Sequence, residues 1–212
     1  MSTRRSTRSL TLDQIVDAAM ELLERDGLGA VTIRAVAERL GVGAMTLYTY
    51  VGTKEGLLAA IASRHLESVA FPGPDLPWRE RIVGTFRVVH DLFAANPELA
   101  GIAASQSIDE IGAFRGAEVV LGALREAGLS DQRAIEAFDA LASYLTGFAL
   151  REAARLTNPV PPASRLREIQ RLPEDEFPHV RALSRPFVAR DPSFDRGLAF
   201  LVDGIVAEAT TS

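Results

Sequence analysis

The stretch TIRAVAERLGVGAMTLYTYV, residues 32–51, decides how the chain can fold. Thr32 belongs to the residue types that cap helix N-termini, and the next apolar residues recur at i, i+3, i+4 and i+7, the spacing of one helical face. Gly41 ends this helix, and a second short helix can begin after Gly43. Two short helices joined by a tight glycine turn are typical of a helix-turn-helix, whose second helix fits the DNA major groove.

The second helix of this pair has an unusual outward face. Val42 and Leu47 are expected to turn inward and pack on the first helix. Met, Thr and Tyr side chains then face outward, where charged or small residues are usual, and such a face favours contact with a partner. The outward residues are Ala44, Met45, Tyr48, Thr49 and Tyr50.

Lys54, the only lysine in the chain, follows this helix directly. It stands beside a capping Thr53 at the start of another amphipathic helix, a place well suited to a DNA phosphate. The alternative is that Lys54 is an ordinary exposed turn residue.

Composition limits the other function classes. The 212 residues carry a net charge of −5 and no cysteine, so disulfides, thiol catalysis and thiolate metal sites are excluded. No run of about twenty apolar residues occurs, which predicts no membrane span. Asn96 and Asn158 each precede proline, which spoils both glycosylation sequons and favours a cytoplasmic protein. The negative charge argues mildly against nucleic acid. Basic residues nevertheless gather at Arg4, Arg5, Arg8 and Arg34, either as a DNA-facing set or as ordinary solvated surface.

Proline and glycine divide the chain. A capping box is expected at Thr11 and Gln14, and residues 71–77, FPGPDLP, cannot continue a helix. We therefore expect an all-α fold in three parts: a flexible basic arm at residues 1–10, a helix-turn-helix domain with its connecting helix at 11–68, and a helical domain at 77–212.

The helical domain at residues 77–212 should contain helices near residues 77–95, 108–127, 130–156 and 191–210. The proline-rich segment 158–193 leaves room for one or two short helical turns. Glycines at 147, 197 and 204 suggest a surface where another helix approaches closely, within the chain or between two copies. The third of these helices should bury one apolar set: Ile135, Phe138, Leu141, Leu145 and Phe148.

Residues 10–61 closely resemble the DNA-binding domain of the TetR family of bacterial transcriptional regulators. The pattern LGV-x-x-x-x-LY-x-(Y/H)-V-x-x-K-E-x-L carries this resemblance, and LREAGLSD, SYLTGFALREAA and FDRGLAFLVDGI look like the tetracycline-repressor-like C-terminal domain. The resemblance implies a homodimeric repressor without a cofactor. It would leave a partly palindromic double-stranded DNA operator when a small apolar or amphipathic effector binds the second domain.

The same resemblance implies which residues meet DNA. Because Gly43, Ala44 and Met45 offer no side-chain hydrogen bond, direct readout would rest on thymine methyl groups, on Thr49 and Tyr50, and on the basic arm. The candidate DNA-binding residues are Thr32, Arg34, Ala44, Met45, Thr46, Tyr48, Thr49, Tyr50 and Lys54, with Arg4, Arg5 and Arg8 in the arm.

Candidate effector residues are the polar and aromatic side chains that interrupt apolar faces of the helical domain at residues 77–212. Each aromatic residue could instead be ordinary core, and the histidine could be structural. They are Phe86, His90, Phe93, Gln106, Phe114, Tyr144 and Phe148.

An enzyme and a helical binding module without DNA affinity are the rival function classes. The pairs Gly27-x-Gly29 and Gly41-x-Gly43 lack the strand and the third glycine of a dinucleotide site. The three histidines are far apart, no H-E-x-x-H occurs, and no serine has a G-x-S-x-G setting. These features predict a non-enzyme without a metal, while nothing in the helical domain excludes a ligand-sensing module.

Overall fold

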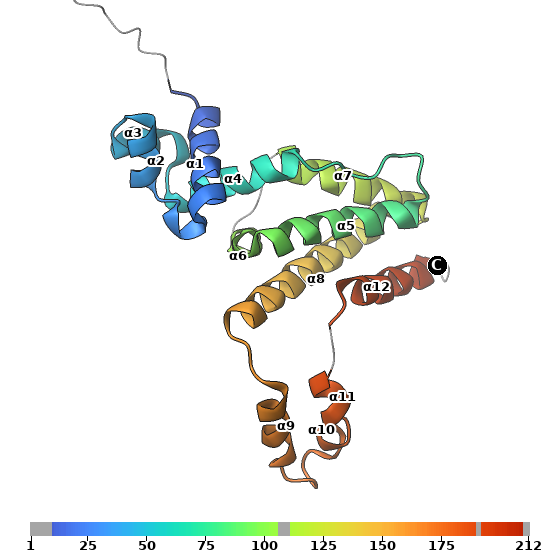
Figure 1. Ribbon diagram of the computed structural model, residues 1–212. Coiled ribbons are helices and arrows are strands. Elements are labelled where there is room, and N and C mark those ends of the chain that lie inside the picture. The colour runs from blue at the N-terminus through green and yellow to red at the C-terminus, as the bar shows by residue number, and fades with distance from the viewer. Residues whose placement is uncertain (1–9, 106–110, 190–191, 210–212) are drawn as a thin grey trace, which may run out of the picture.

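The computed structural model describes residues 10–105, 111–189 and 192–209, and this part of the chain is helical with no strand (Figure 1). The all-α prediction is confirmed. The predicted arm at residues 1–10 lies almost wholly outside the described residues. No described helix is both long and apolar enough to cross a membrane.

The N-terminal helices form a head around one buried cluster. These are α1 (Leu12–Asp26), a 3-10 turn η1 (Leu28–Ala30), α2 (Ile33–Leu40), α3 (Ala44–Val51) and the first half of α4 (Lys54–Glu67). The capping box at α1 is confirmed, since the Gln14 amide donates to Thr11 Oγ1 across 3.2 Å and the Thr11 amide donates to Gln14 Oε1 across 3.1 Å. Ile15, Ala19, Val36 and Leu47 are fully buried at the centre of this cluster.

A second body forms around α5 (Trp78–Ala95), α6 (Pro97–Ser105), α7 (Ile111–Glu126), α8 (Asp131–Thr157) and α12 (Phe194–Ala209) (Figure 1). Ser130 caps α8 as predicted, accepting from the Arg133 amide across 3.4 Å. Helices α5, α7 and α8 pack along one another, and α4 lies against α7. The buried cluster has Ile82, Leu124, Leu141 and Leu198 at its centre.

The prediction that Ile135 lies inside is wrong, because this side chain is 51% exposed. The buried stripe of α8 begins instead with Ala134 and Ala137 and continues through Leu141 and Leu145. One residue is about 100° of helix rotation, so Ile135 points away from the stripe that its small neighbour occupies. Periodicity alone favours a large apolar residue over alanine at such a position.

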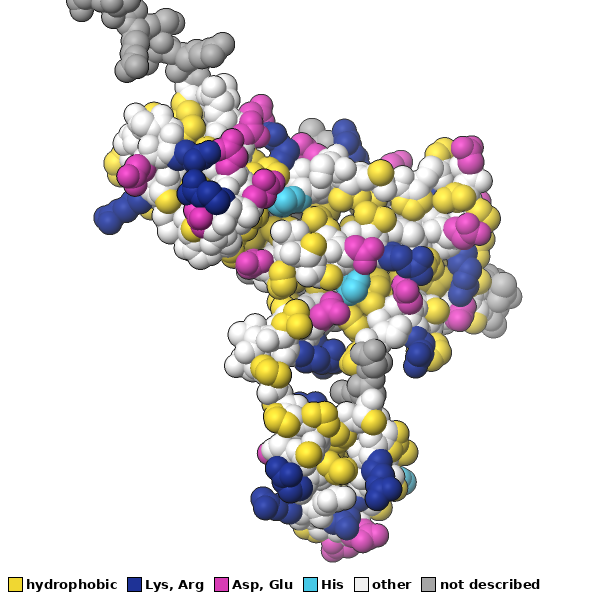
Figure 2. Space-filling model, in the orientation of Figure 1, with side chains coloured by type: hydrophobic (Ala, Val, Ile, Leu, Met, Phe, Trp, Pro, Cys, Tyr) yellow, Lys and Arg dark blue, Asp and Glu magenta, His cyan; other side chains and the backbone are white. Residues whose placement is uncertain are grey.

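The prediction of one or two helical turns within residues 158–193 is also wrong. Three helices occupy the segment: α9 (Pro162–Gln170), α10 (Pro178–Ala182) and α11 (Ser184–Ala189). They contact one another and form a lobe that projects from the body (Figures 1 and 2). Pro162 and Pro178 stand at helix starts, where the missing N–H costs nothing, so these prolines begin helices rather than prevent them.

Candidate DNA-binding surface and effector cavity

The turn between α2 and α3 has the geometry that residues 32–51 predict. Thr32 Oγ1 accepts from the Ala35 amide across 3.1 Å and begins α2. Gly41 ends the helix with φ at +66°, in the left-handed region that favours glycine. Gly43 then precedes α3 in an extended conformation. The two helices pack against each other, and α3 lies at the outer edge of the head (Figure 1).

The outward face of α3 is exposed. Met45 is 76% exposed, and Tyr48 and Tyr50 are 43% and 42% exposed, whereas Leu47 is fully buried. Thr46 and Thr49 are also exposed, and the Thr49 hydroxyl donates to the Thr46 carbonyl across 2.6 Å. That donation leaves the Thr49 oxygen available as an acceptor for a base or phosphate partner.

Two candidate residues on this side of the head have a second, structural task. Ala44 is half-buried and packs against the head cluster, and Thr32 is half-buried with its hydroxyl engaged in the α2 cap. Arg4, Arg5 and Arg8 lie outside the described residues. The face that remains open to a partner is made by Met45, Thr46, Tyr48, Thr49 and Tyr50.

The positive charges of the head separate into two groups. Arg39 pairs with Glu21, and Arg64 pairs with Asp13 and Asp17, so these guanidinium groups fasten α2 and α4 to α1. Arg34 and Lys54 are exposed and have no ion pair with another described residue. Lys54 begins α4, where Thr53 Oγ1 accepts from the Gly56 amide across 3.0 Å. A phosphate at this helix start would meet a cation and a helix dipole together. Basic side chains stand out on the head in Figure 2.

A partly open cavity of about 180 Å³ lies among α4 to α8. Its wall is almost wholly apolar, and two of the predicted effector residues, Phe86 and Phe93, belong to it. Thr85 and Thr146 are the hydroxyl-bearing members of the wall. Thr85 is only 3% exposed, and its Oγ1 has no hydrogen-bond partner within the described structure. A buried hydroxyl without a partner is costly, so a ligand group that reached Thr85 Oγ1 would satisfy it.

Three further candidates, His90, Tyr144 and Phe148, gather around Phe194 instead of lining this cavity. The His90 ring stacks on Phe194 with centroids 4.2 Å apart, and His90 Nε2 lies 3.0 Å from Glu152. The Tyr144 hydroxyl donates to the Phe194 carbonyl across 3.0 Å, and burial raises the pKa of this phenol. The cluster joins the start of α12 to α5 and α8.

The last two candidates lie elsewhere. Phe114 is 60% exposed and lines a surface groove beside the linker, and Gln106 lies outside the described residues. Sequence reasoning missed the other lining residues of the cavity, among them Leu66, Phe71 and Thr85. Thr85 could have been found, because it is the polar interruption in the apolar stripe of α5, whereas Phe71 sits in a segment that reads only as a break.

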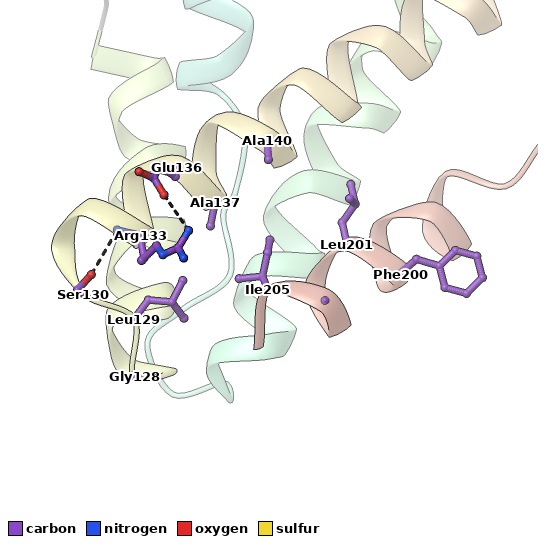
Figure 3. A pocket seen from close by; sticks show the side chains of 11 residues that line it. Gly128, Leu129, Ser130, Arg133, Glu136, Ala137, Ala140, Phe200, Leu201 and Ile205 are labelled. Carbon is purple, nitrogen blue, oxygen red and sulfur yellow. Dashed lines mark hydrogen bonds and ion pairs between the residues drawn. The ribbon is translucent and has the colours of Figure 1, made fainter. Parts of the chain in front are cut away.

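A second hollow lies on the outer side of α8 and α12 (Figure 3). Leu201 and Ile205 of α12 face Ala137 and Ala140 of α8, and Phe200 extends outward at 71% exposure. Of the three glycines predicted to allow close approach of a helix, only Gly197 has a close neighbour among the described residues. A Cβ there would stand 2.0 Å from the Tyr144 hydroxyl oxygen. A Cβ at Gly147 or Gly204 would meet open space, so none of the helices that the structure describes covers those two positions.

A helix-turn-helix head joined by one helix to an all-helical body with an interior cavity defines the class of one-component regulators that bind DNA and a ligand. The chain belongs to the TetR family, which confirms the resemblance in its sequence. The protein-family model for "Bacterial regulatory proteins, tetR family" matches residues 15–61, and the family model for "Tetracyclin repressor-like, C-terminal domain" matches residues 71–209. The chain is thus a ligand-responsive DNA-binding repressor.

Individual relatives agree with this assignment. An HTH-type transcriptional regulator of Saccharopolyspora erythraea is 32% identical over 94% of this chain and 86% of its own length. Apo ActR of Streptomyces coelicolor superposes with a TM-score of 0.82 at 31% identity, covering 94% of this chain and 98% of ActR. ActR has also been solved with actinorhodin, at a TM-score of 0.80 and 29% identity over 95% and 97% of the two chains. BioQ bound to its double-stranded DNA operator gives 0.66 at 27% identity over 93% and 99%.

Proposed function

We propose that this chain works as a cytoplasmic homodimer, released from a partly palindromic operator when a compact, largely apolar molecule enters the cavity among α4 to α8. The observation that carries this proposal is that α4 belongs to both halves of the molecule. Leu57 and Ile61 are buried in the head cluster, Ala62 is buried in the body cluster, and Leu66 lines the cavity. One rigid helix thus connects the ligand wall to the DNA-binding head.

The mechanism follows from two-state linkage. If the effector binds better to a state in which α4 has shifted, it lowers operator affinity, and the operator lowers effector affinity by the same factor. A change from mostly bound to mostly released needs a difference of about 5.5 kcal/mol between the two states. A shift of α4 is transmitted to the head because Arg64 and the buried face of α4 hold it to α1.

The DNA-facing side is assigned to the open face of α3, with Arg34 and Lys54 on phosphates. Apolar Met45 suits thymine methyl groups, and Thr49 and Tyr50 supply the hydrogen bonds. We place the head at residues 11–68 and the effector and dimerisation body at residues 77–212.

A second copy of the chain is assigned to the open side of α8 and α12. Phe200 is too exposed to belong to the core of one chain, and Gly147 and Gly204 leave room for a partner helix. A two-fold pair would present two α3 helices to successive major grooves, about 34 Å apart.

The effector class is suggested by the wall of the cavity and by a relative. Phenylalanine rings line the cavity, and Thr85 offers a single unpaired hydroxyl, which suits an aromatic compound with a hydroxyl or carbonyl group. ActR, which shares the fold at 29% identity, was solved with actinorhodin. We therefore propose aromatic polycyclic compounds as the first group to screen.

The experiment is selection of bound duplexes from a random DNA pool, followed by effector screening on the enriched duplex. An inverted repeat is expected, bound less tightly by Tyr48→Ala and Lys54→Ala than by the native chain. Tyr144→Phe, far from the head, is the control. No enriched sequence, or an operator that no compound of an aromatic panel releases, would contradict the proposal.

A further inference from the structure

The linker between α4 and α5 is seated on two glycines. A Cβ at Gly84 of α5 would stand 2.8 Å from Pro72 Cγ, and a Cβ at Gly116 of α7 would stand 3.2 Å from Phe71 Cζ. The first contact forces Pro72 to shift, and the second requires the Phe71 ring to yield by a few tenths of an ångström, so a larger residue at either glycine would press on the linker. Phe71 and Pro72 are consequently packed into two helix surfaces where glycine alone leaves room.

Phe71 is the only cavity-lining residue, among those the structure describes, that does not lie in a helix. The remaining wall belongs to α4, α5, α6, α7 and α8, where backbone hydrogen bonds and core packing fix each side chain. Phe71 can turn outward by rotation of its own side chain and of a few linker dihedrals. It is therefore the part of the wall that can open at least cost.

The other side of Phe71 faces a surface groove. This groove runs between the linker and α7, and the exposed Phe114 stands in it. Phe71 lines both spaces, so its ring lies between the cavity and the surface groove. At the groove, Arg115 of α7 also donates to the Glu67 carbonyl across 3.5 Å, at the C-terminal end of α4.

The size of the cavity requires a moving wall. At about 180 Å³ it is little larger than an engineered cavity of about 150 Å³ that holds benzene. A compound of several rings would not fit unless part of the wall yields. The helical wall is close-packed and resists such a change, whereas Phe71 has open space behind it.

We propose that the groove between the linker and α7 is the port by which the effector enters, and that the Phe71 side chain gates this port. This inference rests on the proposed effector function of the cavity. Phe114 offers an apolar ring compound its first contact, and Thr85 receives its polar group inside. Phe71 follows Ser68, the C-cap of α4, by only three residues. A bound molecule that keeps Phe71 turned outward therefore displaces the end of α4. Entry and transmission to the head are then one movement.

A cysteine-free chain allows a direct test without an effector. Thr85→Cys places one thiol in the cavity, and its rate of reaction with N-ethylmaleimide reports how often the port opens. We expect Phe71→Ala to raise this rate at least about tenfold. The matched control is Ala123→Cys, fully buried on α7 outside the cavity, whose rate should not change with Phe71→Ala. An unchanged rate at Thr85→Cys, or an equal rise at both positions, would overturn the proposal.

A second pair of variants separates opening of the port from loss of stability. Gly84→Ala lifts Pro72 from its seat, while Gly122→Ala on α7 projects into open space. Both changes raise helix propensity, so neither should loosen the helix that carries it. Gly84→Ala should accelerate labelling of Thr85→Cys and Gly122→Ala should not; the same response to both would refute a role for the seated linker.

The labelling assay contains neither DNA nor effector, so it decides the port separately from the proposed function. Fast labelling in Phe71→Ala together with an operator that no compound releases would contradict the proposed function and leave the port established. Operator release by a compound, with labelling unaffected by Phe71→Ala, would support the proposed function and contradict the port.

Discussion

Arg64 on α4 lies 3.0 Å from the Asp17 carboxylate on α1, across the junction at which α4 joins the head. The same guanidinium pairs with Asp13 and lies 3.7 Å from Glu67 of its own helix. Two acids of α1 on one guanidinium fix the rotation of α4 against α1 more firmly than a single pair would. This contact links the helix that touches the cavity to the helix that supports α2 and α3.

Arg64→Ala should therefore weaken operator binding without contacting DNA. Partly exposed pairs contribute up to about 1 kcal/mol, which corresponds to roughly a fivefold loss of affinity. Fluorescence anisotropy with a labelled operator measures it. Arg25→Ala is the matched control, because Arg25 pairs only with its neighbour Asp26 in the same helix. Equal losses for the two variants would show that the junction has no special role.

Lys54→Ala should reduce the salt dependence of operator binding. Each phosphate contact contributes about 0.9 to the slope of log affinity against log salt, so a dimer should lose about two units. Met45→Ala changes the apolar part of the same face and should leave the slope unchanged while lowering affinity for the preferred sequence. A salt titration of both variants on the selected duplex tests this. Identical slopes for Lys54→Ala and the native chain would remove Lys54 from the phosphate contacts.

Thr85→Val should stabilise the protein without effector and weaken effector binding. The Thr85 hydroxyl is buried without a partner, and its removal should raise the free energy of unfolding by about 1 kcal/mol. For a chain of this length that is a rise in Tm of roughly 2–4 °C. Ser63→Ala is the control: its hydroxyl is also buried and unpaired, but it does not line the cavity. Both variants should gain stability in a thermal melt, and only Thr85→Val should lose effector affinity.

The pH dependence of stability should include a contribution from His65. Burial lowers the pKa of this histidine, opposed by the nearby carboxylate of Glu24, and its Nε2 is buried without a partner. The unfolded chain then binds a proton more readily than the folded one, so this stability is present above about pH 6.5 and is lost as pH falls through the lower folded pKa. His65→Gln should show a smaller fall in urea midpoint between pH 7.5 and 5.5, and exposed His179→Gln should not. An unchanged fall in His65→Gln would contradict the assignment.

Local signals in the sequence were sufficient for the head and insufficient for the cavity. Thr32, Gly41 and Thr53 each act within three or four residues, so capping rules locate α2, α3 and α4 without knowledge of the remaining chain. Thr85 and Phe71 acquire their roles only when α5, α7 and the linker meet, and no local pattern encodes that meeting. The contacts of His90 and Phe148 could not be predicted for the same reason, because their shared partner Phe194 lies far along the chain.

The exposed ring of Phe200 gives the sharpest test of the proposed dimer. Phe200→Glu would place a charge in the centre of the face formed by α8 and α12, where a second copy is proposed to bury it, and burial of an unpaired charge is strongly unfavourable. Sedimentation at micromolar concentration should show a monomer, and operator affinity should fall at least about a hundredfold because two half-sites no longer bind as one unit. Phe114→Glu is the matched control, since this ring is also exposed but lies on α7 away from that face. A dimeric Phe200→Glu with native operator affinity would exclude α8 and α12 as the seam.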